Sequence, residues 1–260
     1  IIFSFLNKQS KFLNMFKKLT LFLLLVCGTI YAQKSFFELR TYELRWGNNP
    51  QPLHDYLSEA LIPALNDNEV ETIGAFEHME NHLPKKIYLL ITYKSMTHYA
   101  NVRKDLMKEA KFLKAKQKYD TVSQEDAPYD RYTTSFYQGF DNYPHLVLPK
   151  KGDVLFELRT YESYSEDAAL RKIKMFNEYE FDIFEAAGLH SVFFGEQVAG
   201  PNMPSLTYIT SHSSMEARNK SWDAFGVYPE WKRVSQLEEF DNTVSNIALD
   251  FLVQLPYSQL

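Results

Sequence analysis

A seven-residue sequence occurs twice in this chain and constrains its fold more than any other feature. Phe37–Glu43 reads Phe-Glu-Leu-Arg-Thr-Tyr-Glu, and Phe156–Glu162 repeats it without a change, 119 positions further on. The same spacing aligns Ser95 with Ser214 and their following methionines. The spacing indicates one module present twice, not an array of short repeats.

Each copy shows the order strand, helix, two strands, helix, strand. Apolar-polar alternation marks the strands and a spacing of three to four residues marks the helices. Ser95 and Ser214 stand where helix N-caps belong, and Gly188 where a helix ends. The first copy predicts strands at 35–42, 71–78, 86–93 and 133–140, helices at 52–65 and 95–118, and a turn at 81–84. The second predicts strands at 156–161, 190–198, 206–212 and 247–255, helices at 167–187, 214–225 and from 229, and a turn at 200–202.

This order is that of a ferredoxin-like β-α-β-β-α-β module, whose four-stranded sheet carries helices on one face only. The bare face needs a cover, and a second module can supply it by packing sheet against sheet. We therefore predict an α+β chain in which two ferredoxin-like modules, 33–141 and 154–260, form an α/β barrel across a linker at 142–153. Such a pair can be a pseudo-dimeric monomer or can assemble further as a homodimer.

The first 32 residues have the pattern of an export signal, so we treat 1–32 as separate from the fold. Lys17 and Lys18 follow Met15, an apolar run occupies 19–26, and Ala32 ends a stretch suited to cleavage. Residues 1–14 resemble an upstream extension. The pattern predicts a periplasmic or extracellular protein, with no membrane attachment after signal removal. Two alternatives stay open: a short membrane anchor, although a spanning helix needs about 20 residues, and a lipid anchor on Cys27.

Charge and cysteine content argue against several classes of function. The whole chain carries a net charge of −5, and the first 32 residues hold four lysines and no acid, so the remainder carries −9. A basic surface for nucleic acid is therefore not expected. Cys27 is the single cysteine, so the processed chain would have no disulfide, thiol nucleophile or thiolate metal ligand. We expect no cofactor.

The repeated strand presents a polar face in both copies. Because side chains two apart on a strand share a face, each copy groups a Glu, an Arg and a Tyr: Glu38, Arg40 and Tyr42, then Glu157, Arg159 and Tyr161. We expect helices to cover the alternating apolar set and the polar set to line a ligand pocket inside the barrel. An arginine fork there suits a carboxylate or enolate oxygen. The structural alternative is that Glu and Arg pair and fix the packing of the sheets.

A histidine in the second copy extends this candidate ligand site. His212 shares a strand face with Tyr208, whereas the first copy has Tyr93 at the position of His212. The histidine can act as a base or haem ligand, or be a polar residue near a sheet end. Glu77 and Glu196 occupy matching positions and can complete an acid–base pair or be surface carboxylates. Since the two copies differ at the position of His212, we expect any functional site to lie mainly in the second copy.

Other histidines and the tryptophans give weaker signals. His78 and His82 are four apart but flank the predicted turn, and the pentapeptide 78–82 lacks the His-Glu-x-x-His order of a metalloprotease. No metal site is therefore expected. Trp222 and Trp231 can stack on a ligand, but such residues also fill cores and interfaces.

Several motifs resemble those of the NIPSNAP family. They are the Glu-Leu-Arg-Thr-Tyr strand, Lys174-Met175-Phe176, Pro204-Ser205-Leu206-Thr207-Tyr208, and Trp222 followed by Pro229-Glu230-Trp231-Lys232. The similarity covers nearly all of 35–255 and is densest in the second copy. It implies a dimeric α/β-barrel fold but no particular activity, since none is established for the family and its better-known eukaryotic members are discussed as interaction proteins. The wider superfamily includes monooxygenases and haem enzymes, and fold does not choose among them.

Two classes of function remain. The first is an exported protein that binds a small molecule or a protein partner through the barrel interior or its surface. The alternative is a cofactor-free enzyme, monooxygenase- or isomerase-like, acting on a small aromatic or acidic substrate in the barrel pocket. A filled apolar interior favours structure or protein binding, whereas an open cavity where Arg159, Tyr161 and His212 converge favours a ligand site.

Overall fold

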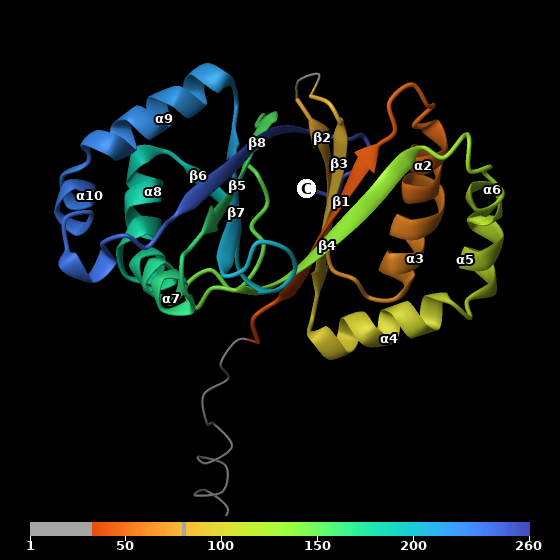
Figure 1. The fold of residues 1–260 in the computed structure, drawn as a ribbon, viewed down its shortest axis with the longest axis horizontal. Helices are drawn as coiled ribbons and strands as arrows, with labels where there is room; N and C mark the ends of the chain where they lie inside the picture. The colour runs from red at the N-terminus through yellow and green to blue at the C-terminus, as the bar shows by residue number, and fades with distance from the viewer. Residues whose placement is uncertain (1–32, 80–81) are drawn as a thin grey trace, which may run out of the picture. The chain divides into compact units, whose positions relative to one another are not determined.

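Eight antiparallel strands close into one barrel, and each copy of the repeat supplies four of them. The structure, a computed structural model, describes residues 33–79 and 82–260, so the expected export signal lies outside it, as does Asn81 of the first predicted turn. Around the barrel the strand order is β1-β3-β2-β8-β5-β7-β6-β4. Figure 1 shows a layer of helices on either side of the strands. The predicted fold class, tandem ferredoxin-like modules in an α/β barrel, is confirmed.

The first module contains strands β1 (Phe36–Leu44), β2 (Ile73–His78), β3 (Lys86–Tyr93) and β4 (Tyr129–Gly139). Its helical layer consists of α2 (Gln51–Asp55), the π-helix η1 (Tyr56–Leu61), α3 (Ile62–Asp67), α4 (Met96–Leu106), α5 (Ala110–Ala115) and α6 (Gln117–Asp120). The single helix expected at 95–118 is thus three shorter ones. The break at 107–109 lies among good helix formers, so helix propensity gave no sign of it. Ser95 caps α4 as expected, accepting a hydrogen bond from the backbone N–H of His98.

The second module contains strands β5 (Leu155–Glu162), β6 (His190–Ala199), β7 (Ser205–His212) and β8 (Asn246–Gln254). Its helical layer consists of α7 (Glu166–Met175), the π-helix η2 (Phe176–Glu180), α8 (Phe181–Ala187), α9 (Met215–Val227), α10 (Pro229–Val234) and the 3₁₀ helix η3 (Glu238–Phe240). Ser214 caps α9, and α8 ends at Gly188 with a left-handed φ of 81°, both as expected. A π-helical turn occurs at matching places in both modules, so it belongs to the fold.

Two seams join the modules. Strand β2 pairs with β8 over Phe76–His78, and β4 pairs with β6 over Phe136–Gly139. Each of the eight strands therefore has a neighbour on both sides, which leaves this barrel without a free edge. The second module covers the sheet face that a single ferredoxin-like module leaves bare.

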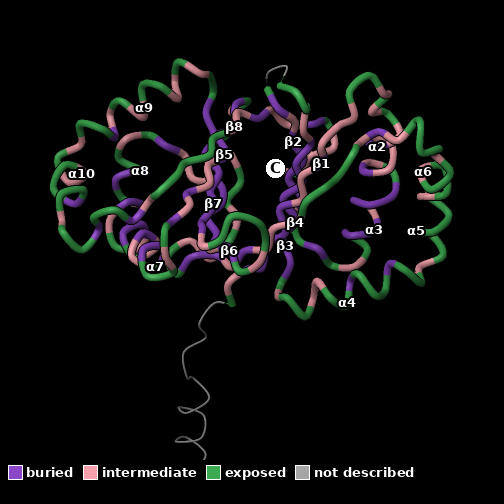
Figure 2. Tube along the Cα trace, viewed as in Figure 1, coloured by how far each residue is buried: buried purple, intermediate pink, exposed green. Residues whose placement is uncertain are grey.

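The interior of the barrel is apolar and filled. All eight strands contribute buried side chains to one cluster: Phe37, Leu39, Phe76, Tyr88, Leu90, Tyr137, Phe156, Leu158, Val192, Phe193, Ile209 and Leu252. Ring centroids of Phe37 and Phe193 lie 4.8 Å apart, and those of Phe76 and Phe156 lie 5.0 Å apart. Figure 2 shows the buried residues concentrated along the strands. The expectation of a ligand pocket at the centre of the barrel is therefore wrong.

The two faces of the repeated strand are the reverse of what we expected. Phe37 and Leu39 belong to the interior cluster, whereas Tyr42 packs with Leu53 of the helical layer. In the second module, Tyr161 likewise packs with residues of the helical layer. The physical reason is that buried polar groups need hydrogen-bond partners. The closed interior offers few such partners, whereas a helix packed on the other face can supply them.

Candidate functional site

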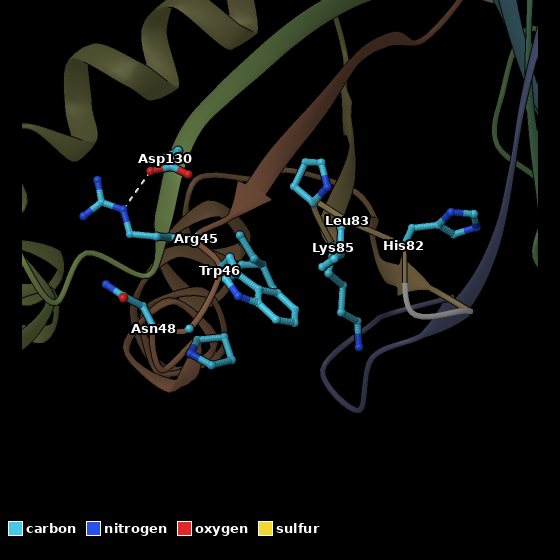
Figure 3. Close-up of a pocket in the computed structure, with 11 residues that line it drawn as sticks. Arg45, Trp46, Asn48, His82, Leu83, Lys85 and Asp130 are labelled. Carbon is cyan, nitrogen blue, oxygen red and sulfur yellow. Dashed lines mark hydrogen bonds and ion pairs between the residues drawn. The ribbon is translucent and has the colours of Figure 1, made fainter.

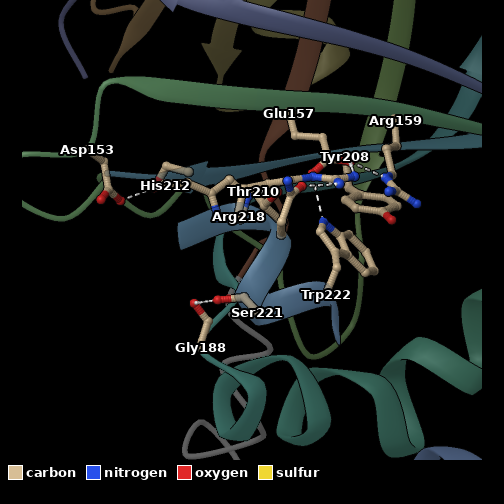
Figure 4. Close-up of polar contacts among 12 residues, drawn as sticks. Asp153, Glu157, Arg159, Gly188, Tyr208, Thr210, His212, Arg218, Ser221 and Trp222 are labelled. Atoms are coloured by element: carbon tan, nitrogen blue, oxygen red, sulfur yellow. Dashed lines mark hydrogen bonds and ion pairs between the residues drawn. The ribbon is translucent and has the colours of Figure 1, made fainter. Parts of the chain in front are cut away.

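A buried carboxylate, Glu157 on β5, forms the centre of a polar cluster in the second module (Figure 4). It accepts hydrogen bonds from Arg159 Nε at 2.6 Å, from Arg218 Nε and Nη2 at 2.8 and 2.7 Å, and from Trp222 Nε1 at 2.8 Å. Arg218 and Trp222 are four residues apart on α9, so they lie on the same face of that helix. The cluster therefore ties the helix to the sheet.

Glu157 stays ionised although it is buried. Burial works to raise the pKa of Glu157, but hydrogen bonds from Arg218 and Trp222 and the charge of Arg159 outweigh it, so this pKa lies below its ordinary value. Four donors occupy its two oxygens, which leaves the carboxylate unsuited to act as a base. Its role is to hold two arginines in place, and the three groups together carry a net charge of +1.

Arg159 and Arg218 both reach solvent, with 15% and 17% of their side chains exposed. The Arg159 Cζ lies 4.0 Å from the ring centroid of Trp222, and the Arg159 Nη1 donates to the Tyr161 hydroxyl at 3.4 Å. That hydroxyl bonds the Tyr208 hydroxyl at 2.8 Å. Burial works to lower the pKa of Arg159, but Tyr208, Tyr161 and Glu157 raise it above its ordinary value. The guanidinium is thus permanently charged and fixed in orientation.

His212 lies at the inner edge of this cluster. Its Nε2 is 3.0 Å from Thr210 Oγ1 and 3.7 Å from the nearer Glu157 oxygen. Burial lowers the pKa of His212 below its ordinary value; the charge of Glu157 opposes this, and the charge of Arg218 adds to it. The imidazole is therefore neutral at pH 7. The structure brings together five of the residues predicted for the second copy: Glu157, Arg159, Tyr161, Tyr208 and His212.

The free energy of unfolding is expected to decrease as pH falls from 7.5 to 5.5. Burial lowers the pKa values of His54, His78 and His212, so the unfolded chain binds these protons more tightly. Stability is then lost as pH falls through about 6.5, at about 1.4 kcal/mol per unit of pKa difference. Urea unfolding at both pH values measures the loss, and His212→Asn should reduce it. A stability that is constant or higher at pH 5.5 would contradict the expectation.

The first module forms a different cluster at the matching place. Glu38 accepts hydrogen bonds from Arg40 Nε at 2.9 Å, from the Tyr93 hydroxyl at 3.2 Å and from Thr134 at 3.1 Å. Arg40 also donates to the hydroxyl of Tyr42. Since each triad lies under its own helical layer, the six residues predicted to line one pocket form two separate clusters.

Glu77 and Glu196 join neither cluster. Glu77 forms an ion pair with Lys85 at 2.7 Å. Glu196 is partly exposed and lies in a pocket of about 310 Å³ beside Lys174 and Asn177. These positions fit the surface-carboxylate interpretation better than an acid–base pair.

A second buried ion pair, missed from the sequence, lies beneath Tyr161. Lys172 of α7 binds Glu180 at the end of η2, and both side chains are buried. The Lys172 Nζ lies 4.7 Å from the ring centroid of Phe176, 5.5 Å from that of Trp231 and 5.7 Å from that of Tyr161. Burial raises the pKa of Glu180, and the charge of Lys172 opposes this rise. Lys172 is thus surrounded by three aromatic rings and has the Glu180 carboxylate as its counter-ion.

The repeat itself contains the signal for this pair. Leu53 and Leu61 stand 119 positions before Lys172 and Glu180, and both leucines are buried in the core of the first module. The fold therefore accepts two leucines where the second copy has a lysine and a glutamate. A buried ion pair stabilises less than well-packed apolar groups of similar size, so the pair is a specialisation of the second module.

A group of three ionisable residues at the β2–β8 seam was also missed. His78 Nε2 lies 2.7 Å from the Tyr88 hydroxyl and 3.1 Å from Asp250 Oδ1, and Tyr88 donates to Asp250 Oδ2 at 3.0 Å. His78 Nδ1 is buried and has no hydrogen-bond partner among the residues that the structure describes. The second copy has the neutral residues Gln197 and Thr207 where the first has His78 and Tyr88.

The fold and these clusters define a class of protein: two ferredoxin-like modules closed into one dimeric-type α/β barrel, with a Glu-Arg-Tyr triad under each helical layer. A model of the NIPSNAP family matches residues 37–128 and 156–259, one match in each copy. The chain belongs to the NIPSNAP family. Within the described residues, no helix is long and apolar enough to cross a membrane. The same residues contain no group of three or more side chains placed to hold a metal ion.

Solved structures with the same fold include two bacterial proteins. A "putative monooxygenase" from Lactobacillus acidophilus NCFM has a TM-score of 0.55 at 11% identity, covering 85% of this chain and 94% of its own. A second, from Fusobacterium nucleatum, has a TM-score of 0.52 at 11% identity, covering 86% and 94%. An uncharacterised NIPSNAP-like domain protein from Burkholderia xenovorans covers 41% of this chain and 90% of its own, with a TM-score of 0.37 at 13% identity. The similarity to the first two of these structures shows the fold alone. A comparison with curated proteins found no match.

Proposed function

We propose that the protein binds a small organic anion with an apolar body, and that Arg159 of the second module holds the anionic group. The observation that carries this proposal is the fixed and partly exposed guanidinium of Arg159. Its hydrogen-bond partners among the described residues are Glu157 and Tyr161, whereas a guanidinium has five N–H groups. The unused groups can form a bidentate contact with a carboxylate.

Strand β8 supplies an apolar surface beside this guanidinium. Leu249 pairs with Arg159 and Ile247 pairs with Tyr161, so these side chains share one face of the sheet. Leu249 is 40% exposed and Ile247 is 48% exposed. The Trp222 ring also packs against Arg159, with its centroid 4.0 Å from Arg159 Cζ. A ligand with its carboxylate on Arg159 would cover these aliphatic side chains, and the net charge of the cluster favours an anion.

The filled barrel interior supports this choice of site. Phe156 and Leu158, which alternate with Glu157 and Arg159, are buried in the interior cluster. A ligand in the interior would have to displace close-packed rings, which costs more than adding contacts to an existing surface. The helix side of β5 and β8 is therefore the better site.

Arg159→Gln is expected to weaken binding of octanoate and phenylacetate at least tenfold, because a charge-assisted hydrogen bond contributes about 1.5–3 kcal/mol. Isothermal titration calorimetry with these two probes measures the affinity, and urea unfolding checks that the fold is retained. Arg40→Gln is the matched control, because Arg40 has the same sequence neighbours in the other module.

Three outcomes would overturn the binding proposal. The first is that neither probe binds the wild-type protein. The second is that both variants lose affinity equally, and the third is that Arg159→Gln binds the probes as well as the wild type does. Loss of the fold in Arg159→Gln would instead support the structural interpretation of the Glu-Arg pair. Arg159→Lys, which keeps the charge without the planar fork, then serves as the second test.

Export is part of this proposal and rests on the pattern of residues 15–32. Protein purified from the periplasm or medium of its host is expected to begin at Gln33, because Ala32 ends the cleavage stretch. Intact-mass measurement and N-terminal sequencing check the start. Recovery of a chain that retains residues 19–26, or of lipid-modified Cys27, would contradict cleavage after Ala32.

The alternative function is that of a cofactor-free enzyme, and the His78–Tyr88–Asp250 group favours it. A histidine is commonly placed for acid–base catalysis when one ring nitrogen contacts a carboxylate and the other can accept or donate a proton. Mass spectrometry of each probe after incubation with the protein tests for turnover. Product formation that Asp250→Asn abolishes, while Arg159→Gln retains it, would favour the enzyme over the binding protein.

A further inference from the structure

A groove lies in the first module, between the segment that follows β1 and the segment that leads into β3 (Figure 3). Its volume is about 570 Å³, which is within the range of small-molecule sites. The lining comes from residues 44–48, Pro50, residues 82–85 and Asp130. None of these residues belongs to the Arg159 cluster, so the groove is a separate site.

Two large apolar side chains stand exposed in this groove. Trp46 is 80% exposed and Leu83 is 67% exposed. Leu44, Pro50 and Pro84 complete the apolar lining. Figure 3 shows the Trp46 ring extending from the segment of Arg45 and Asn48 toward Lys85. A tryptophan offers a large apolar area for burial, and contiguous exposed apolar surface marks a binding site more often than isolated residues do.

The wall that carries Trp46 is held in place by its neighbours. Arg45 donates from Nε to Asp130 at 2.7 Å and from Nη1 to the Gln124 carbonyl at 2.7 Å. Asn48 donates to the Glu125 carbonyl at 2.7 Å. These bonds fix both residues that flank Trp46 and Gly47, so the indole is presented by a preformed wall. A preformed site loses less conformational entropy when a ligand binds.

The charged groups of the lining are already neutralised by the protein. Arg45 pairs with Asp130 at 2.7 Å, and Lys85 pairs with Glu77 at 2.7 Å. The His82 ring packs against His78, with centroids 5.1 Å apart. A charged ligand would have to compete with these pairs and lose hydration as well. What the groove offers a ligand is therefore apolar surface without net charge.

We propose that this groove binds an uncharged, flat aromatic molecule that stacks on Trp46 and packs against Leu83. Offset or edge contacts between the ligand ring and the indole, and burial of the leucine, supply the affinity. The neutral lining distinguishes this site from the Arg159 cluster, which carries a net positive charge and takes an anion.

Two fluorescent probes that differ by one sulfonate test the proposal directly. N-phenyl-1-naphthylamine is neutral, and 8-anilino-1-naphthalenesulfonate is the same ring system with an anionic group. The neutral probe is expected to bind saturably in the groove with one site per chain. In the Arg159→Gln variant, which removes the proposed anion site, the sulfonate is expected to bind at least tenfold more weakly than the neutral probe. Trp46→Ala is expected to weaken binding of the neutral probe about tenfold or more, as loss of a tryptophan anchor does in other interfaces.

Matched variants outside the groove complete the experiment. Tyr164→Ala and Leu148→Ser remove side chains of comparable exposure from other surfaces and should leave the affinity of the neutral probe unchanged, whereas Leu83→Ser should lower it. Arg159→Gln should also leave it unchanged, which separates this site from the proposed anion site. Unchanged binding of the neutral probe in Trp46→Ala would overturn the proposal, as would a sulfonate that binds Arg159→Gln as tightly as the neutral probe does.

Discussion

Glu180→Leu is expected to lower the free energy of unfolding by about 3–5 kcal/mol, because it leaves the buried ammonium of Lys172 without its counter-ion. The aromatic rings around Lys172 offset part of this cost through cation–π contacts, but they do not replace a carboxylate. Lys172→Leu should cost a similar amount, since it strands Glu180 in the core. Urea unfolding at pH 7 measures both losses.

The double variant Lys172→Leu/Glu180→Leu gives the more decisive result in this experiment. It copies the leucines that the first module carries at the matching positions, Leu53 and Leu61, so its stability is expected to equal or exceed that of the wild type. A double variant as unstable as either single variant would mean that the ion pair is required for packing. Recovery of stability would show that the second module retains the pair for a reason other than stability.

Glu157→Leu is expected to destabilise the protein by a comparable amount, about 3–5 kcal/mol, because it removes the one carboxylate that Arg159 and Arg218 share. Trp222 would lose its hydrogen-bond acceptor as well. Glu38→Leu in the first module is the control. It strands one arginine, Arg40, and should therefore cost less. Equal losses for the two variants would contradict the argument that two cations depend on Glu157.

Acid unfolding provides a second readout for Glu157. Its pKa in the folded protein lies below the ordinary value, so the stability it contributes is present above about pH 4.5 and is lost as pH falls further. The wild type should therefore lose stability more steeply below pH 4.5 than Glu157→Leu does. Parallel curves for the two proteins would contradict an ionised Glu157 in the fold.

Much of the architecture was predictable because it depends on local order. The strand sequence 37–43, its copy and the alternation around them predicted two modules, and the serines at 95 and 214 predicted where two helices begin. The grouping of Glu157, Arg159 and Tyr161 on one face was also predictable, since a strand places every second side chain together. These features depend on residues that are close in the sequence and not on which elements pack against the sheet.

The partners of those residues were not predictable, because they come from distant parts of the chain. Arg218 reaches Glu157 from α9, and Asp250 reaches His78 from the last strand. Their contacts depend on how each helix docks and on where the barrel closes. The Lys172–Glu180 pair is an intermediate case, since aligning the two copies reveals it as a departure from a leucine pair.

The sequence by itself determined that this NIPSNAP-family chain consists of two copies of one module and which side chains of the repeated strand lie together. Only the tertiary structure decided on which side of the sheet they lie. Alternation defines two faces but not their surroundings, and the surroundings differ. The barrel centre accepts Phe37 and Phe156, while on the other face Glu38 bonds Tyr93 of β3 and Glu157 bonds Arg218 of α9. Buried charge goes where hydrogen-bonding partners are available.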